Sequence, residues 1–364
     1  MSRKAFLGCL LGLAVGDAMG YTVDSHTWQE IQEDYGPNGL RGYDSVGGFV
    51  EVTSYTQLAA FTINGLLMGL TRGQMRGQMA PYIRYVGIAC REWASTQRRG
   101  QRVSPNHCWL TIHSDICGHY CMDTRMLDIL SKEHLGTPEE PQNHCGGPQA
   151  LTAAIGVGMF FHPDRTDQRE IDRLGAEAVA LTYGNPEAFL TGAIISHLIS
   201  RLLRNPREDF KKLVSGAMNA LRNQFGHQYS QAYEICNTLK LAVSLSQGLY
   251  HNHAEIMEKL HCETASQCLA GAIYACLIGG EDLDASMIVA VNHSGRSAAV
   301  GALTGAIQGI RLGCEALPEF YLEDIQPAPL LYELATDLHQ GCPMVKGNRL
   351  FDGDWDRKYL HGGR

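Results

Sequence analysis

Hydrophobic residues recur at the spacing of an α-helix along most of the chain. Apolar side chains at positions i, i+3, i+4 and i+7 predict helices over residues 5–15, 56–70, 170–181, 187–203, 209–221, 230–245, 265–277 and 297–310. Asn185 followed by Pro186 is typical of a helix N-cap and a first-turn proline. Strict alternation is scarce, and residues 108–112 are the best candidate for a strand. The pattern therefore predicts an all-α fold, a single compact bundle of many helices.

Two of the predicted helices carry a glycine at every fourth position. The two stripes are Gly8, Gly12 and Gly16, then Gly301, Gly305 and Gly309. A glycine inside a helix costs about 1 kcal/mol relative to alanine, so its repetition needs a structural reason. We expect close packing of these helices against their neighbours. Approach of a ligand to the exposed backbone is the alternative.

The N-terminal residues have the outline of a signal peptide, because Arg3 and Lys4 precede an apolar run. Glycines interrupt that run, Asp17 follows it, and no convincing cleavage site is present. We interpret the segment as a buried first helix. The chain has no run of 18 uncharged apolar residues, so we predict no membrane span.

The composition narrows the classes of partner. The 364 residues are 45% hydrophobic and 19% charged, which suits a globular protein with a large core. Without a fixed-period repeat or a low-complexity linker, one domain over residues 1–364 is the preferred division. The net charge of −8 argues against nonspecific binding to nucleic acid or to an anionic membrane. The twelve cysteines lie mostly in apolar stretches, so we expect reduced thiols and a cytoplasmic protein.

Residues 104–150 differ from the rest of the chain and have the character of an insertion. They hold five of the fifteen histidines and four of the twelve cysteines. Cys117, His119 and Cys121 suggest zinc, but their spacing does not match the usual paired ligand modules. We expect a polar loop that lines a cleft, with structural zinc as the alternative.

Three motifs in this order resemble one enzyme family. The first, Gly12-Leu-Ala-Val-Gly16-Asp17-Ala18-Met-Gly20, is similar to the opening motif of the ADP-ribosylglycohydrolases, which include the dinitrogenase reductase-activating glycohydrolases. Residues 51–58 and 290–306 stand where that family has a Thr-Asp-Asp-Thr-Gln and a Gly-Gly-Asp-Ala-Asp-Thr signature. The resemblance spans about residues 5–315. It implies an all-α domain with an active site in a cleft at one end of the bundle.

The resemblance also implies two magnesium ions, which active relatives hold through the last two signatures. The matching positions carry Thr53, Ser54 and Tyr55, then Arg296, Ala298 and Ala299. Magnesium prefers oxygen ligands, usually including carboxylates, and a guanidinium repels a nearby dication. We therefore predict no metal at these positions and no cofactor.

The replacing residues are themselves suited to binding a ligand. Arg296 offers a rigid fork of donors for phosphate, carboxylate or ribose oxygens, and Tyr55 adds a hydroxyl and an aromatic face. Thr53, Ser54 and Ser294 complete this part of the candidate site. A structural ion pair is the alternative for Arg296, and core packing is the alternative for Tyr55.

Hydrolysis of an N-glycosidic bond needs a carboxylate near the anomeric carbon and a group that activates water. Asp17 and Asp24 are the candidate carboxylates, although Asp17 is also suited to bracing the backbone. His293, beside Arg296, is a candidate acid or base. Residues that could line the substrate-binding site are His144, Gly146 and Gly147.

Three functions remain open on the sequence. The first is metal-independent hydrolysis of an N-glycosidic substrate, ADP-ribosyl or nucleoside-like. The second is a catalytically inactive protein that binds ADP-ribose or a nucleotide, and the third is an interaction protein that retains only the scaffold. A small-molecule ligand is expected in the first two cases, with neither nucleic acid nor membrane as a partner. The oligomeric state is left open.

Overall fold

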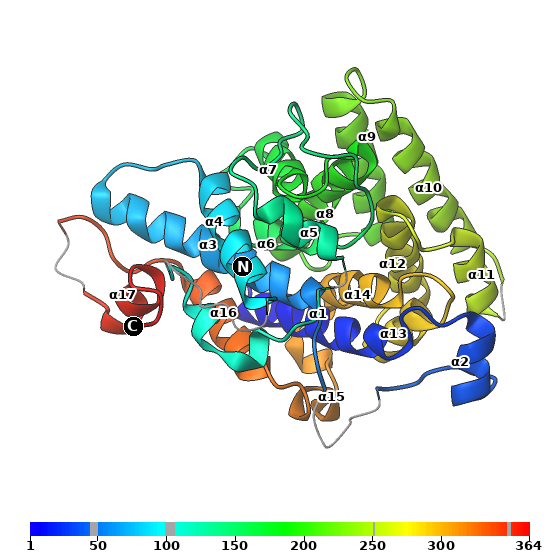
Figure 1. The fold of residues 1–364 in the computed structure, drawn as a ribbon. Helices are drawn as coiled ribbons and strands as arrows, with labels where there is room; N and C mark the ends of the chain where they lie inside the picture. The colour runs from blue at the N-terminus through cyan, green and yellow to red at the C-terminus, as the bar shows by residue number, and fades with distance from the viewer. Residues whose placement is uncertain (44–49, 99–105, 122, 250–251, 348–350) are drawn as a thin grey trace.

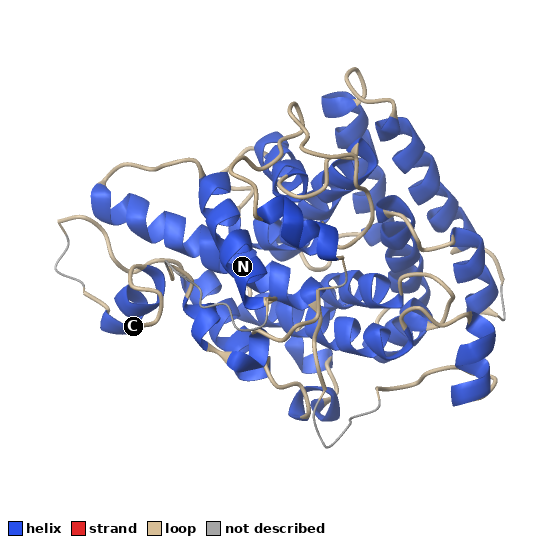
Figure 2. Ribbon diagram, viewed as in Figure 1, coloured by secondary structure: helices blue, strands red, loops and turns tan. Residues whose placement is uncertain are grey.

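The computed structural model describes residues 1–43, 50–98, 106–121, 123–249, 252–347 and 351–364. Within these residues the regular structure is helical, and the one β-bridge, between Val50 and Ile325, is isolated. Figure 2 shows the resulting all-helical architecture. The predicted all-α fold is confirmed.

The helices follow one another along the chain with short connections. Their bounds are α1 Arg3–Val23, α2 Trp28–Tyr35, α3 Ser54–Arg76, α4 Tyr82–Thr96, α5 Thr124–Leu130, α6 Leu151–Phe160, α7 Gln168–Ala180, α8 Pro186–Arg204, α9 Phe210–Phe225, α10 Gln231–Leu245, α11 His253–Leu260, α12 Ala265–Gly279, α13 Leu283–Val291, α14 Ser297–Leu312, α15 Glu319–Glu323, α16 Ala328–Gln340 and α17 Gly353–Tyr359. Short 3₁₀ turns, η1 to η3, cover Trp109–Ile112, Ser114–Ile116 and Cys314–Ala316.

The two glycine stripes meet along the seam between α1 and α14, which lie side by side in the middle of the molecule (Figure 1). The helices run antiparallel, so Gly12 faces Gly305 and Gly16 faces Gly301. A Cβ atom on Gly12 would lie 2.3 Å from the Gly305 carbonyl oxygen, and one on Gly16 would lie 2.0 Å from the Gly301 oxygen. The expected close packing of the stripes is confirmed, because only glycine allows the two backbones to touch.

The other core helices pack around this central pair. The helices α3 and α16 contact α1, and α3 also contacts α4, α6 and α14. On the other side, α12 and α13 contact α14, while α8 packs against α6, α7 and α9. The helices α1, α3 and α14, which contain the predicted helical segments 5–15, 56–70 and 297–310, are therefore in mutual contact. A single domain stays our prediction for the chain.

The predicted helices agree with the structure to within a few residues at most ends, whereas the predicted strand is wrong. Asn185 caps α8 by accepting a hydrogen bond from the Glu187 backbone N–H, with Pro186 in the first turn, as expected. Residues 109–112 form the 3₁₀ turn η1 instead of a strand. The Thr111 N–H donates to the Cys108 oxygen, and the Cys108 N–H donates to the Glu92 carboxylate, so this backbone satisfies its bonds without a neighbouring strand.

The helix α1 is long and apolar enough, by length and composition, to cross a bilayer. However, 89% of its most apolar 18-residue window is buried inside the protein, mainly against α14, α16 and α3. This burial is that of a core helix, as the sequence interpretation expected. All twelve cysteines are free thiols, and seven of them are buried.

Candidate ligand-binding site

The three motifs meet where the C-terminal end of α1 approaches the N-terminal ends of α3 and α14. Asp24 is the C-cap residue of α1, Thr53 is the N-cap of α3, and Arg296 is the N-cap of α14. Because α1 and α14 are antiparallel, the glycine seam fixes the position of Asp24 relative to Arg296. The structure therefore brings the motif residues together at one end of the central pair.

Asp17 is completely buried and braces the start of α3. Its carboxylate accepts four hydrogen bonds, from the backbone N–H groups of Thr53 (2.9 Å) and Thr56 (3.1 Å) and from their hydroxyls (2.7 and 2.6 Å). Burial raises the pKa of Asp17 to about 6, although these hydrogen bonds oppose the shift. With its oxygens occupied, Asp17 holds the two motifs together, and this geometry favours bracing over catalysis.

Asp24 is half-buried and joins α1 to α14. Its Oδ1 accepts a hydrogen bond of 3.0 Å from the Ala298 backbone N–H in the first turn of α14, where a negative charge is stabilised by the helix dipole. Its Oδ2 accepts no hydrogen bond from the described residues. Burial raises the pKa of Asp24, against the effects of the Ala298 N–H and the charge of Arg296.

Arg296 and Tyr55 lie close enough to Asp24 for its charge to raise the pKa of both groups, and Tyr55 in turn acts on the pKa of Arg296. The Arg296 Nε donates to Glu263 over 3.1 Å, while its two terminal nitrogens donate to no described residue. The Tyr55 ring is buried (1% exposed), and its hydroxyl has no hydrogen-bond partner in the described part of the chain. The ion-pair partner of Arg296 is thus Glu263, and neither of the two candidate carboxylates, Asp17 and Asp24, pairs with it directly.

His293 is buried in the loop before α14 and makes two local hydrogen bonds. Its Nε2–H donates to the Ala290 oxygen (2.9 Å), and its Nδ1 accepts from the Gly295 N–H (3.0 Å). Burial lowers the pKa of His293 to about 4, so the imidazole is neutral at pH 7. Both ring nitrogens are used to shape the loop, and this geometry does not support His293 as an acid or base.

Ser294 and Ser54 also have structural contacts. The Ser294 hydroxyl accepts from the Trp28 N–H at the start of α2, and the Ser294 N–H donates to Glu258. The Ser54 N–H donates to the Tyr120 oxygen, and the Ser54 residue is 1% exposed. These contacts anchor the loops around the site.

The loop at residues 143–147 is tied to the turn between α7 and α8. The Asn143 side chain bonds to the Thr182 oxygen and to the Gly184 N–H. At Gly147 the φ angle is +126°, and a Cβ there would lie 2.7 Å from Gln149 Oε1. Gly146 packs against Asn185, whereas His144 is exposed.

Beside this loop the structure shows a polar group that the sequence analysis missed. Asp123, 8% exposed, accepts three side-chain hydrogen bonds from Arg125 and one from the Tyr183 hydroxyl. Burial opposes the ionisation of Asp123, but these hydrogen bonds outweigh it and lower its pKa. Tyr183 is close enough to affect the pKa of Tyr55. The Leu181-Thr182-Tyr183 motif was the signal that could have identified this group.

A second missed group is the segment 261–263, which precedes α12 and supplies Glu263. His261 and Cys262 are consecutive non-glycine residues with positive φ angles, 62° and 51°. The Cys262 oxygen accepts the Arg296 N–H over 2.8 Å. Strained backbone of this kind is concentrated at functional sites. A single Glu outside any motif does not stand out in a sequence. Glu263 is therefore recognised only from its ion pair with Arg296 in the folded protein.

The side chains at this end of the bundle do not fit two magnesium ions. Thr53 donates its hydroxyl to Asp17, Tyr55 presents a bulky ring, and Ala298 and Ala299 present buried methyl groups. Among the described residues, no group of three or more His, Cys, Asp or Glu side chains is placed to hold a metal. In the 104–150 segment, which includes undescribed residues 104, 105 and 122, the Cys117 and Cys121 thiols bond to backbone oxygens of Leu110 and Asp123.

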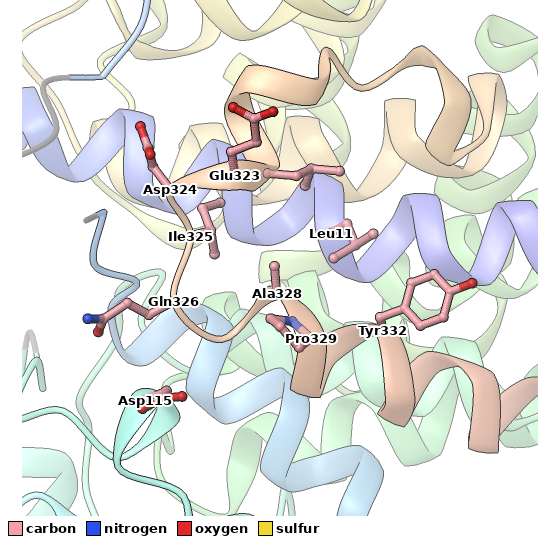
Figure 3. A pocket seen from close by; sticks show the side chains of 10 residues that line it. Leu11, Asp115, Glu323, Asp324, Ile325, Gln326, Ala328, Pro329 and Tyr332 are labelled. Carbon is pink, nitrogen blue, oxygen red and sulfur yellow. The ribbon is translucent and has the colours of Figure 1, made fainter. Parts of the chain in front are cut away.

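The site residues lie at a partly exposed surface. Five cavities lie at other places on the protein, and none of them is lined by a predicted site residue. The largest of these five, about 580 Å³, lies beside α1 and the start of α16 and is lined by residues that include Asp115, Glu323 and Asp324 (Figure 3). Of residues 104–150, Asp115 lines this cavity, whereas residues 133–137 and 139 line a second cavity of about 560 Å³ beside α4 and the end of α7. The segment therefore lines a cleft as expected, but one that contains none of the predicted site residues.

The fold and the site together define an all-helical protein whose polar centre lies at the ends of its central helices. A profile of the ADP-ribosylglycohydrolase family matches residues 2–348. An uncharacterized protein of Archaeoglobus fulgidus is 33% identical over 352 residues, which cover 93% of this chain and 97% of that protein. The chain belongs to the ADP-ribosylglycohydrolase family.

A solved structure described as an ADP-ribosylglycohydrolase-related protein complex has the same fold. It superposes with a TM-score of 0.57 at 22% sequence identity, and the match covers 93% of this chain and 98% of that one. At this identity the likeness defines the architecture, and the chemistry must be argued from the site residues.

Proposed function

We propose that this protein binds a small ribose-containing ligand, such as ADP-ribose or a nucleoside, without a metal ion and without turning it over. One observation carries the proposal: Asp24 Oδ2, the Tyr55 hydroxyl and the terminal nitrogens of Arg296 come from three neighbouring elements, and none of these atoms has a hydrogen-bond partner among the described residues. Acceptors and donors gathered in this way are suited to the hydroxyl groups of a ribose.

We infer that the ligand is not hydrolysed, because the other candidate catalytic residues, Asp17 and His293, are already fully hydrogen-bonded within the protein. Asp17 has both oxygens occupied, and His293 has both nitrogens occupied and a lowered pKa. Glycoside hydrolysis generally uses two carboxyl groups placed on either side of the bond. Asp24 alone is free, so the second group of such a pair is not supplied by these residues.

The loss of the metal site is part of the same proposal. It is supported by the alanine methyl groups at positions 298 and 299 and by the guanidinium of Arg296, none of which can ligate magnesium. Ligand binding should therefore be the same in excess Mg²⁺ and in excess EDTA.

Isothermal titration calorimetry with adenosine and with ADP-ribose tests the proposal. At least one ligand should bind, with the same affinity in Mg²⁺ and in EDTA, and chromatography after overnight incubation should recover it intact. A ligand that binds only in Mg²⁺ would contradict metal independence. Binding of neither ligand would leave the scaffold alone as the function of the chain.

Metal-independent hydrolysis is the second candidate function, and the raised pKa of Asp24 favours it. A carboxyl group whose pKa is raised by burial stays protonated to a higher pH, as a general acid requires. Incubation of an ADP-ribosylated peptide with the protein in EDTA should then release ADP-ribose. The Asp24→Asn variant, which keeps an oxygen for the Ala298 N–H, should abolish the release.

A further inference from the structure

The ion pair between Arg296 and Glu263 lies at the surface of the proposed site. The side chains are 40% and 50% exposed, and the Arg296 Nε donates to Glu263 Oε2 over 3.1 Å. Only one of the five guanidinium donors is used in this contact. Arg296 is therefore accessible to a ligand, but its charge is already opposed by a carboxylate.

The backbone holds Glu263 in this position through several contacts. Its neighbours His261 and Cys262 have positive φ angles, the Arg296 N–H donates to the Cys262 oxygen, and the Glu263 N–H donates to Gln267 Oε1 over 3.3 Å. A Cβ on Gly295 would lie 2.5 Å from the His261 oxygen, so the two loops are in close contact. The hydrogen bond from Arg296 Nε is the only one that the Glu263 carboxylate accepts from a described residue.

The surrounding charges are mostly negative. The carboxylates of Glu263 and Asp24 act on the pKa of Arg296 itself. Those of Glu187, Asp24 and Glu263 act on the pKa of the neighbouring Cys268, and those of Glu258 and Glu263 act on that of Cys262. Glu187 and Glu258 are fixed by hydrogen bonds to the Ser266 N–H and the Ser294 N–H. A phosphate group at Arg296 would therefore meet an excess of negative charge.

We infer that Glu263 determines specificity at this site by neutralising Arg296, so that the site takes a phosphate-free N-riboside, such as an uncharged nucleoside, and rejects phosphate-bearing ligands. The inference rests on the proposed function. The carboxylates that repel phosphate are good acceptors for ribose hydroxyl groups. An acidic side chain beside a ribose site combines attraction for the wanted ligand with repulsion of its charged analogues.

Glu263→Gln tests the inference, because glutamine keeps the shape and an acceptor oxygen for Arg296 but removes the charge. Calorimetry should show that the wild type binds adenosine at least tenfold more tightly than AMP or ADP-ribose. In Glu263→Gln the affinity for AMP and for ADP-ribose should rise at least tenfold, while that for adenosine stays within about twofold. Glu208→Gln is the matched control, since Glu208 pairs with Arg201 on the surface of α8, and it should change none of these affinities.

A wild type that binds AMP as tightly as adenosine would overturn the inference, as would equal changes for all three ligands in Glu263→Gln. If none of the three ligands binds the wild type, the proposed function fails, and inorganic pyrophosphate then tests Glu263 by itself. Pyrophosphate should raise the melting temperature of Glu263→Gln but not that of Glu208→Gln. Equal melting temperatures with and without pyrophosphate in both variants would contradict the role of Glu263.

Discussion

Along the seam between α1 and α14, glycines bring two backbones into contact, and a single added carbon atom would overlap a carbonyl oxygen. At the end of the same two helices, Asp24, Tyr55 and Arg296 have polar atoms that bond to none of the residues that the structure describes. The seam is fully packed by its own atoms. The polar atoms at its end would gain hydrogen-bond partners only if a ligand bound there. The seam thus fixes how α1 and α14 pack, and the groups available to bind a ligand lie at its end.

The largest effect is expected from breaking the seam. Gly12→Ala should destabilise the protein by about 3 kcal/mol, because its methyl group would meet backbone that cannot rotate away. Gly216→Ala is the matched control on α9, where a Cβ meets nothing within 4 Å, and it should stabilise by up to about 1 kcal/mol. Urea unfolding measures both. If both substitutions changed the free energy of unfolding in the same direction, the proposed need for glycine at the seam would be contradicted.

Asp17 lies between the seam and the proposed site. We expect its substitution to lower the stability of the protein, since its carboxylate holds the start of α3. Asp17→Asn should cost about 2 kcal/mol, because the amide places a donor against donors from Thr53 and Thr56. Urea unfolding at pH 7 measures the loss. A stable variant without ligand binding would instead place Asp17 in the site.

The pH dependence of stability gives a second measurement on Asp17. Burial raises its pKa from 3.8 to about 6, so the folded state binds this proton more tightly than the unfolded state. Its contribution to stability is therefore fully present below about pH 4 and is lost as the pH rises through about 6. The stability of the wild type minus that of Asp17→Asn should fall across this interval. A flat difference between pH 4 and pH 7 would contradict the raised pKa.

Arg296 should separate binding from folding. Arg296→Ala should abolish ligand-induced stabilisation in a thermal-shift assay while changing stability by less than about 1 kcal/mol, since its ion pair is half-exposed. Arg296→Lys should restore binding only in part, because lysine lacks the planar fork. Arg201→Ala removes a comparable surface pair and should leave the ligand shift intact. A large loss of stability in Arg296→Ala without ligand would make the residue a structural one.

The smallest effect is expected at Tyr55. Tyr55→Phe removes a hydroxyl that bonds to no described residue, so stability should change by less than about 0.5 kcal/mol. Ligand affinity should fall by about 1 kcal/mol, the contribution of one hydrogen bond. Calorimetry and urea unfolding of the same variant measure the two quantities. An unchanged affinity would remove the hydroxyl from the site.

The sequence identified the main helices correctly because long amphipathic segments carry many independent signals. It did not include α4 and α16, which have 15 and 13 residues. It also missed short helices such as α2, α5 and α17, whose few residues give a periodic pattern little support. Residues 108–112 were wrongly predicted as a strand, because their apolar alternation is a local pattern. Their backbone conformation depends on a buried carboxylate, Glu92, which accepts the Cys108 N–H. Boundaries such as that of α3, which extends to Arg76, depend on contacts beyond the helix.

For the site, order along the chain was enough to place Asp24, Tyr55 and Arg296 in one region. It was not enough to assign roles, because a role depends on which atoms are already bonded. The bonding of Asp17 and His293, and the pairing of Arg296 with Glu263, involve residues 2 to 39 positions apart. A pattern of residue types contains no record of such pairings.

By itself, the sequence determined the all-helical class, the glycine seam and the family, because each depends on periodicity or on ordered motifs within the chain. The tertiary structure alone decided which carboxylate braces the fold, which keeps a free oxygen, and which neutralises Arg296. The physical reason is that hydrogen bonds and charges act through space over a few ångströms, so their partners are chosen by the packing of distant segments.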